Sequence, residues 1–174
     1  MQKLLFTITF SLIVIITGCS SKHPTSNNTY ETPRQTTIFN PEEALALARI
    51  EKNSQKRSTL LLTAADDYWN KNLISQARAA AEAVSAVDLP LTLRQKYWLL
   101  LLSIGNTLND IALLQRAIPE ANKPELFQTN TDNQRKLLHQ LVTAHITIQQ
   151  PLYAALTLIE HAGLFTGEES EQLN

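Results

Sequence analysis

From Asn40 to the end of the chain, apolar residues recur at spacings of three and four, which places them on one face of an α-helix. Three runs show this spacing: Leu61, Ala64, Ala65 and Tyr68; Ala77, Ala80, Ala81 and Val84; and Tyr97, Leu100, Leu101 and Ile104. No segment alternates apolar and polar residues with the period of two that is typical of a half-buried strand. The pattern therefore predicts an all-α domain over residues 40–174.

Capping residues indicate where these helices begin. Asn40-Pro41-Glu42-Glu43 combines a capping residue, a proline at the first helical position and acidic residues in the first turn. A capping box pairs Ser or Thr with Glu or Gln three residues later. This pattern occurs as Thr92 with Gln95, Thr131 with Gln134 and Thr166 with Glu169, and in a weaker form as Thr107 with Asp110. We therefore expect helices to begin at each of these positions.

A spacing of three and then nine residues recurs along the predicted helices. It occurs as Ala65, Tyr68 and Ala77, as Leu100, Ser103 and Ala112, and as Thr143, Ile146 and Ala155. Small residues at such offsets let two antiparallel helices approach closely. Ala112 follows Ala77 by 35 residues, near the tetratricopeptide period of about 34 residues. Ala155 follows Ala112 by 43 residues, which predicts a longer connection over residues 122–131.

The spacing resembles a degenerate array of tetratricopeptide-like antiparallel helical hairpins, an α-solenoid. Arg116 and Pro119 depart from it, because they stand where Ala81 and Val84 lead us to expect small or apolar residues. A plain antiparallel helical bundle is the alternative. A helix starting at Thr166 would have barely two turns before Asn174, and so short a helix is marginal in water. It either forms a small terminal cap or, as we expect, residues 40–174 are the first part of a longer protein.

The first 18 residues have the features of a secretory signal peptide. Lys3 gives a positive start, Leu4 to Ile16 is mostly apolar, and small Gly18 precedes Cys19. The apolar run is shorter than the roughly 20 residues that span a bilayer. The stretch ending in Cys19 resembles the bacterial lipobox, which implies cleavage after Gly18 and lipid on Cys19. A cysteine within an ordinary signal peptide is the alternative.

Residues 19–39 are predicted to form the lipidated Cys19 and a flexible tether. They are rich in Ser, Thr, Asn and Pro, so they bury too little apolar surface to offset the entropy of ordering. A flexible linker of this length reaches roughly 25 Å. In enterobacteria-like sorting, an aspartate directly after the lipidated cysteine favours retention in the inner membrane. This chain has Ser20 at that position. The resemblance therefore implies an outer-membrane lipoprotein that faces the periplasm.

Charge and motifs argue against several classes of chemistry. The chain has 15 basic and 16 acidic residues, whereas nucleic-acid binding calls for a basic surface. Phosphate-binding loops, Gly-x-Ser-x-Gly turns and His-Glu-x-x-His motifs are absent from the sequence. His139 and His145 are six residues apart, which puts them on different sides of a helix and not at the i, i+4 spacing of metal ligands. The adjacent Asp66 and Asp67 point about 100° apart on a helix, so their carboxylates cannot readily act on one reacting atom. We expect no catalytic residue, metal, cofactor or small-molecule substrate.

Two other groups of side chains have alternative interpretations. Four basic residues lie close together at the start of the domain: Arg49, Lys52, Lys56 and Arg57. Because Glu42, Glu43 and Glu51 are interleaved with them, we expect an ordinary solvated face, with contact to anionic lipid or an acidic partner as the alternative. Trp69 and Trp98 lie beside helix-pairing positions and are expected in the core or in a groove wall.

A narrower resemblance involves most of the predicted helical domain. The segments that carry it are Arg57–Ala65, Leu73–Arg78, Asp88–Leu91 and Arg94–Leu102. Together with the lipobox and the tether, they resemble the N-terminal region of LpoA-type (LppC-type) lipoproteins, activators of penicillin-binding proteins, over roughly residues 57–174. In that family a second domain, similar to periplasmic solute-binding proteins, follows the helical one and docks on a bifunctional peptidoglycan synthase.

The resemblance implies a non-catalytic regulator of peptidoglycan synthesis whose partners are the membrane, through lipid on Cys19, and a bifunctional penicillin-binding protein. None of the family's binding residues matches a distinctive motif here, so the partner-binding residues stay unassigned. The alternatives are a tetratricopeptide-type lipoprotein scaffold for outer-membrane protein assembly and a cell-wall hydrolase.

Overall fold

The computed structural model describes residues 40–128 and 131–164. Within these ranges the chain forms seven α-helices and three short 3-10 helices and contains no strand, which confirms the all-α prediction. The α-helices are α1 (Pro41–Ile50), α2 (Ser54–Asn70), α3 (Ile74–Glu82), α4 (Leu91–Leu108), α5 (Ile111–Ala121), α6 (Thr131–Thr147) and α7 (Pro151–Glu160). The 3-10 helices are η1 (Ala86–Asp88), η2 (Pro124–Phe127) and η3 (Ala162–Leu164). The predicted signal peptide, Cys19, the tether and the helix start at Thr166 lie outside the described residues.

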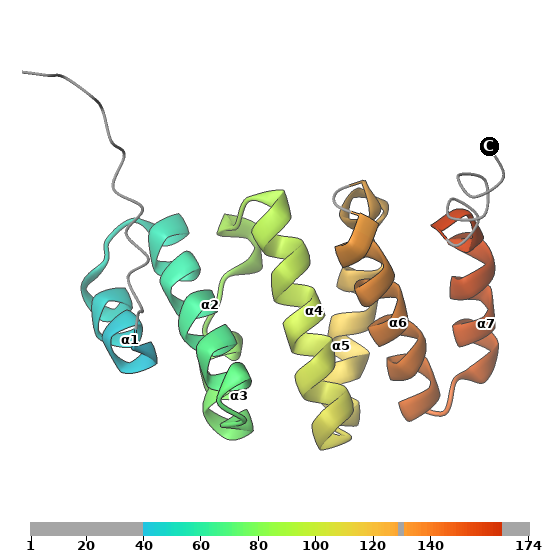
Figure 1. The fold of residues 1–174 in the computed structure, drawn as a ribbon, viewed down its shortest axis with the longest axis horizontal. Coiled ribbons are helices and arrows are strands. Elements are labelled where there is room, and N and C mark those ends of the chain that lie inside the picture. Colours follow the sequence, from blue (N-terminus) through green and yellow to red (C-terminus); the bar gives the residue numbers. More distant parts are fainter. Residues whose placement is uncertain (1–39, 129–130, 165–174) are drawn as a thin grey trace, which may run out of the picture. The chain divides into compact units, whose positions relative to one another are not determined.

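Consecutive helices pack against each other as hairpins (Figure 1). The hairpins α2–α3, α4–α5 and α6–α7 each turn through one residue with a positive φ angle, namely Asn72 at 58°, Asn109 at 50° and Gln149 at 60°. After each turn, an amide N–H donates to a carbonyl five residues back: Leu73 to Tyr68 (2.8 Å), Asp110 to Gly105 (2.9 Å) and Gln150 to His145 (2.7 Å). These bonds define the Schellman motif, so the three hairpins share one turn geometry.

The shared turn aligns the hairpins and corrects the predicted alignment. Asn109 follows Asn72 by 37 residues, and Gln149 follows Asn109 by 40. Five residues beyond each turn stand Ala77, Leu114 and Ala154, and all three are buried. Ala112 and Ala155, which the sequence pattern aligned with Ala77, are exposed. The spacing of small residues was misleading because α5 and α7 carry alanines on their outer faces as well.

The corrected alignment also explains why Arg116 and Pro119 depart from the repeat pattern expected in the second hairpin. Ile118 is the equivalent of Ala81, and both are buried. Arg116 and Pro119 occupy exposed positions of α5, where neither a charge nor a proline disturbs the packing. The predicted longer connection is present, since η2 lies between α5 and α6.

Two of the predicted helix starts agree with the structure and two need correction. Helix α1 begins at Pro41 and α6 at Thr131, as predicted, although the Asn40 side chain makes no capping bond. Helix α4 begins at Leu91, directly after Pro90, so Thr92 lies inside its first turn. A proline fixes φ near the helical value and so begins the helix without a side-chain cap.

The other correction concerns α5, whose N-cap is Asp110 itself. The Asp110 side chain accepts a hydrogen bond from the amide N–H of Leu113 at 3.0 Å. Thr107, the predicted capping residue, lies within α4, which continues to Leu108. The predicted capping box therefore identified a helix start three residues too early.

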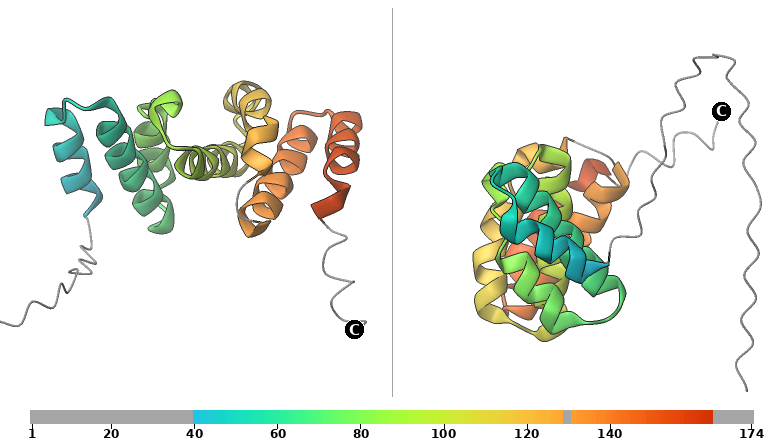
Figure 2. Two further views of the ribbon diagram at one scale, coloured as in Figure 1. Left: turned by 90° about the horizontal axis from the view of Figure 1, so that it is seen from above. Right: turned by 90° about the vertical axis from the view of Figure 1, so that its left-hand side faces the viewer.

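One hydrophobic core runs through the hairpins, with different residues in each part. In the first hairpin it consists largely of alanines: Ala64, Ala65, Ala77, Ala80 and Ala81. Farther along it consists mainly of larger residues, including Leu101, Leu102, Ile104, Leu114, Leu137 and Leu141. These small side chains let α2 and α3 approach closely. Figure 2 shows the order of the helices from two further directions. No helix within the described ranges combines the length and apolarity needed to cross a bilayer.

Candidate functional site

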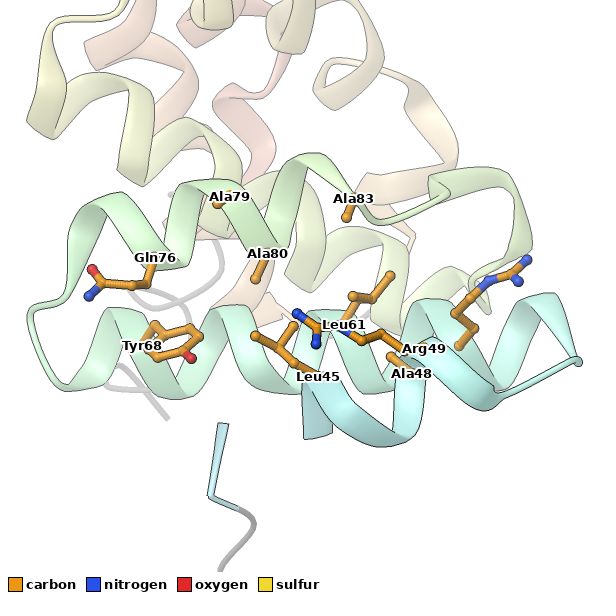
Figure 3. Close-up of a pocket in the computed structure, with 10 residues that line it drawn as sticks. Leu45, Ala48, Arg49, Leu61, Tyr68, Gln76, Ala79, Ala80 and Ala83 are labelled. Carbon is orange, nitrogen blue, oxygen red and sulfur yellow. The ribbon is translucent and has the colours of Figure 1, made fainter. Parts of the chain in front are cut away.

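A groove of about 520 Å³ runs along α2, between α1 and α3 (Figure 3). Both helices pack against α2, so α2 forms its floor and the other two helices form its walls. The residues lining it are Leu45, Ala48 and Arg49 of α1, Arg57, Leu61 and Tyr68 of α2, Gln76, Ala79 and Ala80 of α3, and Ala83 directly after α3. We call this feature the α1–α3 groove. Most of its lining is aliphatic, a composition typical of small-molecule sites.

Tyr68 lines one end of the α1–α3 groove, beside the Glu42 carboxylate. Tyr68 is buried there, and its hydroxyl group donates a hydrogen bond to Glu42 Oε1 at 3.4 Å. Burial, followed by the nearby Glu42 carboxylate, raises the pKa of the Tyr68 phenol. The phenol therefore stays protonated at neutral pH and serves as a hydrogen-bond donor to Glu42.

Two arginines also line the α1–α3 groove. Arg49 lies in the last turn of α1 and Arg57 in the first turn of α2, and both side chains are exposed. Among the described residues, neither arginine forms an ion pair with a carboxylate. The predicted basic strip is therefore divided, because Lys56 lines a different hollow, together with Glu51.

A second groove, also about 520 Å³ in volume, crosses α2, α4 and α6. It is lined by Asp66, Trp69 and Asn70 of α2, Thr92, Lys96, Leu99, Leu100 and Ser103 of α4, and Asn133, Lys136 and Gln140 of α6. Lys96 Nζ lies 2.7 Å from Asp66 Oδ2. We call this the α2–α4–α6 groove. Its polar donors and its tryptophan suit a protein segment better than an apolar ligand.

Helix α7 exposes a large apolar surface. Leu152, Tyr153, Leu156 and Ile159 are 69%, 57%, 50% and 71% exposed. Only Ala154 and Thr157 of this helix are buried. A helix that is apolar on nearly all sides is normally buried, and contiguous exposed apolar patches mark interaction sites. We call the four residues the α7 face.

The aspartate, tryptophan and histidine residues singled out in the sequence lie in ion pairs, in a groove wall, in the core or on the surface. Asp66 pairs with Lys96, while Trp69 lines a groove and Trp98 is buried in the core. His145 is buried with its ring centroid 6.0 Å from that of Tyr153, and His139 is exposed on the same helix. Within residues 40–128 and 131–164 no three His, Cys, Asp or Glu residues are grouped as metal ligands would be.

Sequence reasoning missed both the α1–α3 groove and the α7 face. The groove depends on α1 and α3, which are separated in sequence by the whole of α2, so no local motif indicates it. The α7 face had a signal in the nearly uninterrupted apolar run from Pro151 to Ile159, which offers no polar side for solvent.

Comparisons with known proteins give no match: no family model, no curated protein and no solved structure is similar to this chain. The resemblance to LpoA-type lipoproteins therefore rests on the sequence segments that carry it.

Proposed function

We infer that this chain is a lipid-anchored, non-catalytic regulator of peptidoglycan synthesis that binds a bifunctional penicillin-binding protein. Lipid on Cys19 holds it in the outer membrane, facing the periplasm. Its hairpins form a tetratricopeptide-like α-solenoid, a reading supported by the shared turns at Asn72, Asn109 and Gln149. Their spacings of 37 and 40 residues are close to the period of about 34 residues, and stacked hairpins provide extended binding surfaces.

The observation that carries the proposal is the α7 face. Half or more of the surface of each of Leu152, Tyr153, Leu156 and Ile159 stays exposed. Exposing these side chains to water is unfavourable by about 25 cal/mol per Å² of apolar surface, so binding another protein surface is favoured. The α2–α4–α6 groove offers a second contact surface of polar and aromatic character.

A pull-down from lysed cells tests the proposal. The full chain is used as bait beside a variant carrying Leu156→Glu and Ile159→Glu. Because both residues are exposed, this variant should fold as the wild type does. The matched control carries Ile50→Glu and Val87→Glu, whose side chains are 76% and 83% exposed elsewhere on the surface. We expect the wild type and the control to recover a bifunctional penicillin-binding protein, and the α7-face variant to lose it.

Other outcomes would replace this proposal. Recovery of a barrel-assembly protein in place of a penicillin-binding protein would indicate a scaffold for outer-membrane protein assembly. A clearing band in zymography with the purified chain would show that it hydrolyses the cell wall and is therefore catalytic.

A further inference from the structure

The α1–α3 groove has no role in the proposed protein contact, and its chemistry differs from that of the other surfaces. We propose that it binds a single-chain lipid with a carboxylate head, a ligand of the fatty-acid class. The acyl chain lies over Leu61 between the walls of the groove, and the carboxylate lies at Arg49 and Arg57. This binding function is additional to the proposed regulation and does not depend on it.

The walls of the groove suit an alkyl chain. On the α3 side the lining is Gln76, Ala79, Ala80 and Ala83, and on the α1 side it includes Leu45 and Ala48 (Figure 3). Alanines leave the space open that larger side chains would fill. From Arg57 to Tyr68 the floor helix rises about 16 Å, at about 1.5 Å per residue. This is similar to the length of an extended dodecanoyl chain.

The two arginines that line the groove suit a carboxylate. Arg49 and Arg57 have no carboxylate partner among the described residues. Their guanidinium groups donate hydrogen bonds in the planar arrangement that matches a carboxylate. Arg57 lies in the first turn of α2, where the positive end of the helix dipole favours an anion. The ligand is therefore oriented, with its head at the arginines and its tail toward Tyr68.

The lining argues against a protein segment as the occupant. An extended peptide brings main-chain N–H and C=O groups that each need a hydrogen-bond partner, and apart from the two arginines only Gln76 and Tyr68 among the lining residues carry a polar side-chain group. The Tyr68 hydroxyl is already bonded to Glu42. A stable interface with a second copy of the chain would bury about 20–30 residues on each side, whereas ten residues line this groove. An alkyl chain needs neither hydrogen bonds nor so large a surface.

Isothermal titration of the full chain, exchanged into amphipol, with dodecanoate tests the proposal. The uncharged 1-dodecanoylglycerol carries the same tail and serves as the comparison ligand. We expect dodecanoate to bind at least tenfold more tightly than 1-dodecanoylglycerol. A variant with Ala79→Leu and Ala83→Leu fills the groove from two exposed positions, and it should weaken binding of both ligands tenfold or more.

A second variant separates the contribution of the arginine charges to binding from that of the open apolar groove. Arg49→Ala with Arg57→Ala should weaken dodecanoate about tenfold, a loss typical of charge-assisted hydrogen bonds, and leave 1-dodecanoylglycerol unchanged. The matched control removes the exposed charges of Arg116 and Lys123 by alanine substitution and should change neither affinity. Circular dichroism checks that each variant keeps its helices.

Three results would overturn the proposal. The first is dodecanoate binding that is equal in the wild type and in the groove-filled variant. The second is a wild type that binds an acidic amphipathic peptide but not dodecanoate, with the groove-filled variant losing the peptide. The third is a dimer in analytical ultracentrifugation that the groove-filled variant converts to a monomer.

Discussion

Gly105 in α4 lies directly against Leu114 in α5, so that a β-carbon added at Gly105 would stand 2.6 Å from Leu114 Cδ2. Leu114 is fully buried and has little freedom to move away. The equivalent positions in the other two hairpins are Tyr68 with Ala77, and His145 with Ala154. Each hairpin thus combines one large and one small buried residue near its turn, which keeps the packed volume similar although the residues differ.

This relationship predicts the effect of Gly105→Ala. The added methyl group overpacks the core, at a cost of about 1–3 kcal/mol, while alanine improves helix propensity by up to about 1 kcal/mol. We expect a net loss of about 1 kcal/mol in the free energy of unfolding, measured by urea denaturation. In a Leu114→Ala background the clash is removed, so Gly105→Ala should stabilise the protein. A destabilisation of the same size in both backgrounds would contradict the packing argument.

Asp110 joins two hairpins through both of its carboxylate oxygens. Oδ1 accepts the amide N–H of Leu113 at 3.0 Å, and Oδ2 lies 2.7 Å from Arg78 Nη2 in α3. Asp110→Asn retains an oxygen for the cap but loses the ion pair, so we expect a loss of about 0.5–1 kcal/mol. Asp110→Ala loses both, and we expect about 1 kcal/mol more, as is typical of a lost cap.

Denaturation at two salt concentrations separates the two contributions of Asp110. The difference between wild type and Asp110→Asn should shrink at high salt, because salt screens the ion pair. The further loss in Asp110→Ala should persist, because the cap is a hydrogen bond to the backbone. Equal stability of the asparagine and alanine variants would show that the cap contributes nothing.

His145 predicts a pH dependence of stability. Burial lowers its pKa below the ordinary value of 6.5, an effect that a hydrogen bond with Gln150 opposes. The unfolded chain therefore binds more protons than the folded chain around this pH. The contribution of neutral His145 to stability is complete above the unfolded pKa and declines as the pH falls through it toward the lower folded pKa.

The measurement is urea denaturation between pH 7.5 and pH 5.5. The wild type should lose stability over this interval, and His145→Gln should lose less of it. The exposed His139 lies on the same helix, so His139→Gln is the matched control and should follow the wild type. Identical pH profiles for the wild type and His145→Gln would rule out His145 as the source.

The sequence predicts the helical class well because burial and helical periodicity coincide in α2 and α4. Leu61, Ala64 and Tyr68 illustrate this, since their spacing of three and four corresponds to the face of α2 that packs on its neighbours. Alignment between hairpins is harder to predict, because it depends on turns at Asn72, Asn109 and Gln149. Asparagine tolerates a positive φ angle, but glutamine gives no such signal.

The candidate sites depend still more on tertiary structure. The sequence predicts that Arg49 and Arg57 belong to one solvated strip, yet packing of α1 on α2 makes both part of the lining of an apolar groove. Their spacing of eight residues on two different helices carries no information about Ala79 or Ala83, which complete the groove. Surfaces formed by helices that are distant in sequence therefore cannot be predicted from the spacing of residues within one helix.

The predicted anchor lies outside the described residues and is tested by Cys19→Ser. A thiolate accepts the diacylglyceryl group, and a hydroxyl is a much weaker nucleophile, so we expect an uncleaved or soluble chain without lipid. Metabolic labelling with a radioactive fatty acid should mark the wild type and not the variant. Two or more acyl chains bind membranes stably because each buried methylene contributes about 0.8 kcal/mol. Processed, membrane-bound Cys19→Ser protein, or an unlabelled wild type, would contradict the lipid anchor and with it the outer-membrane location.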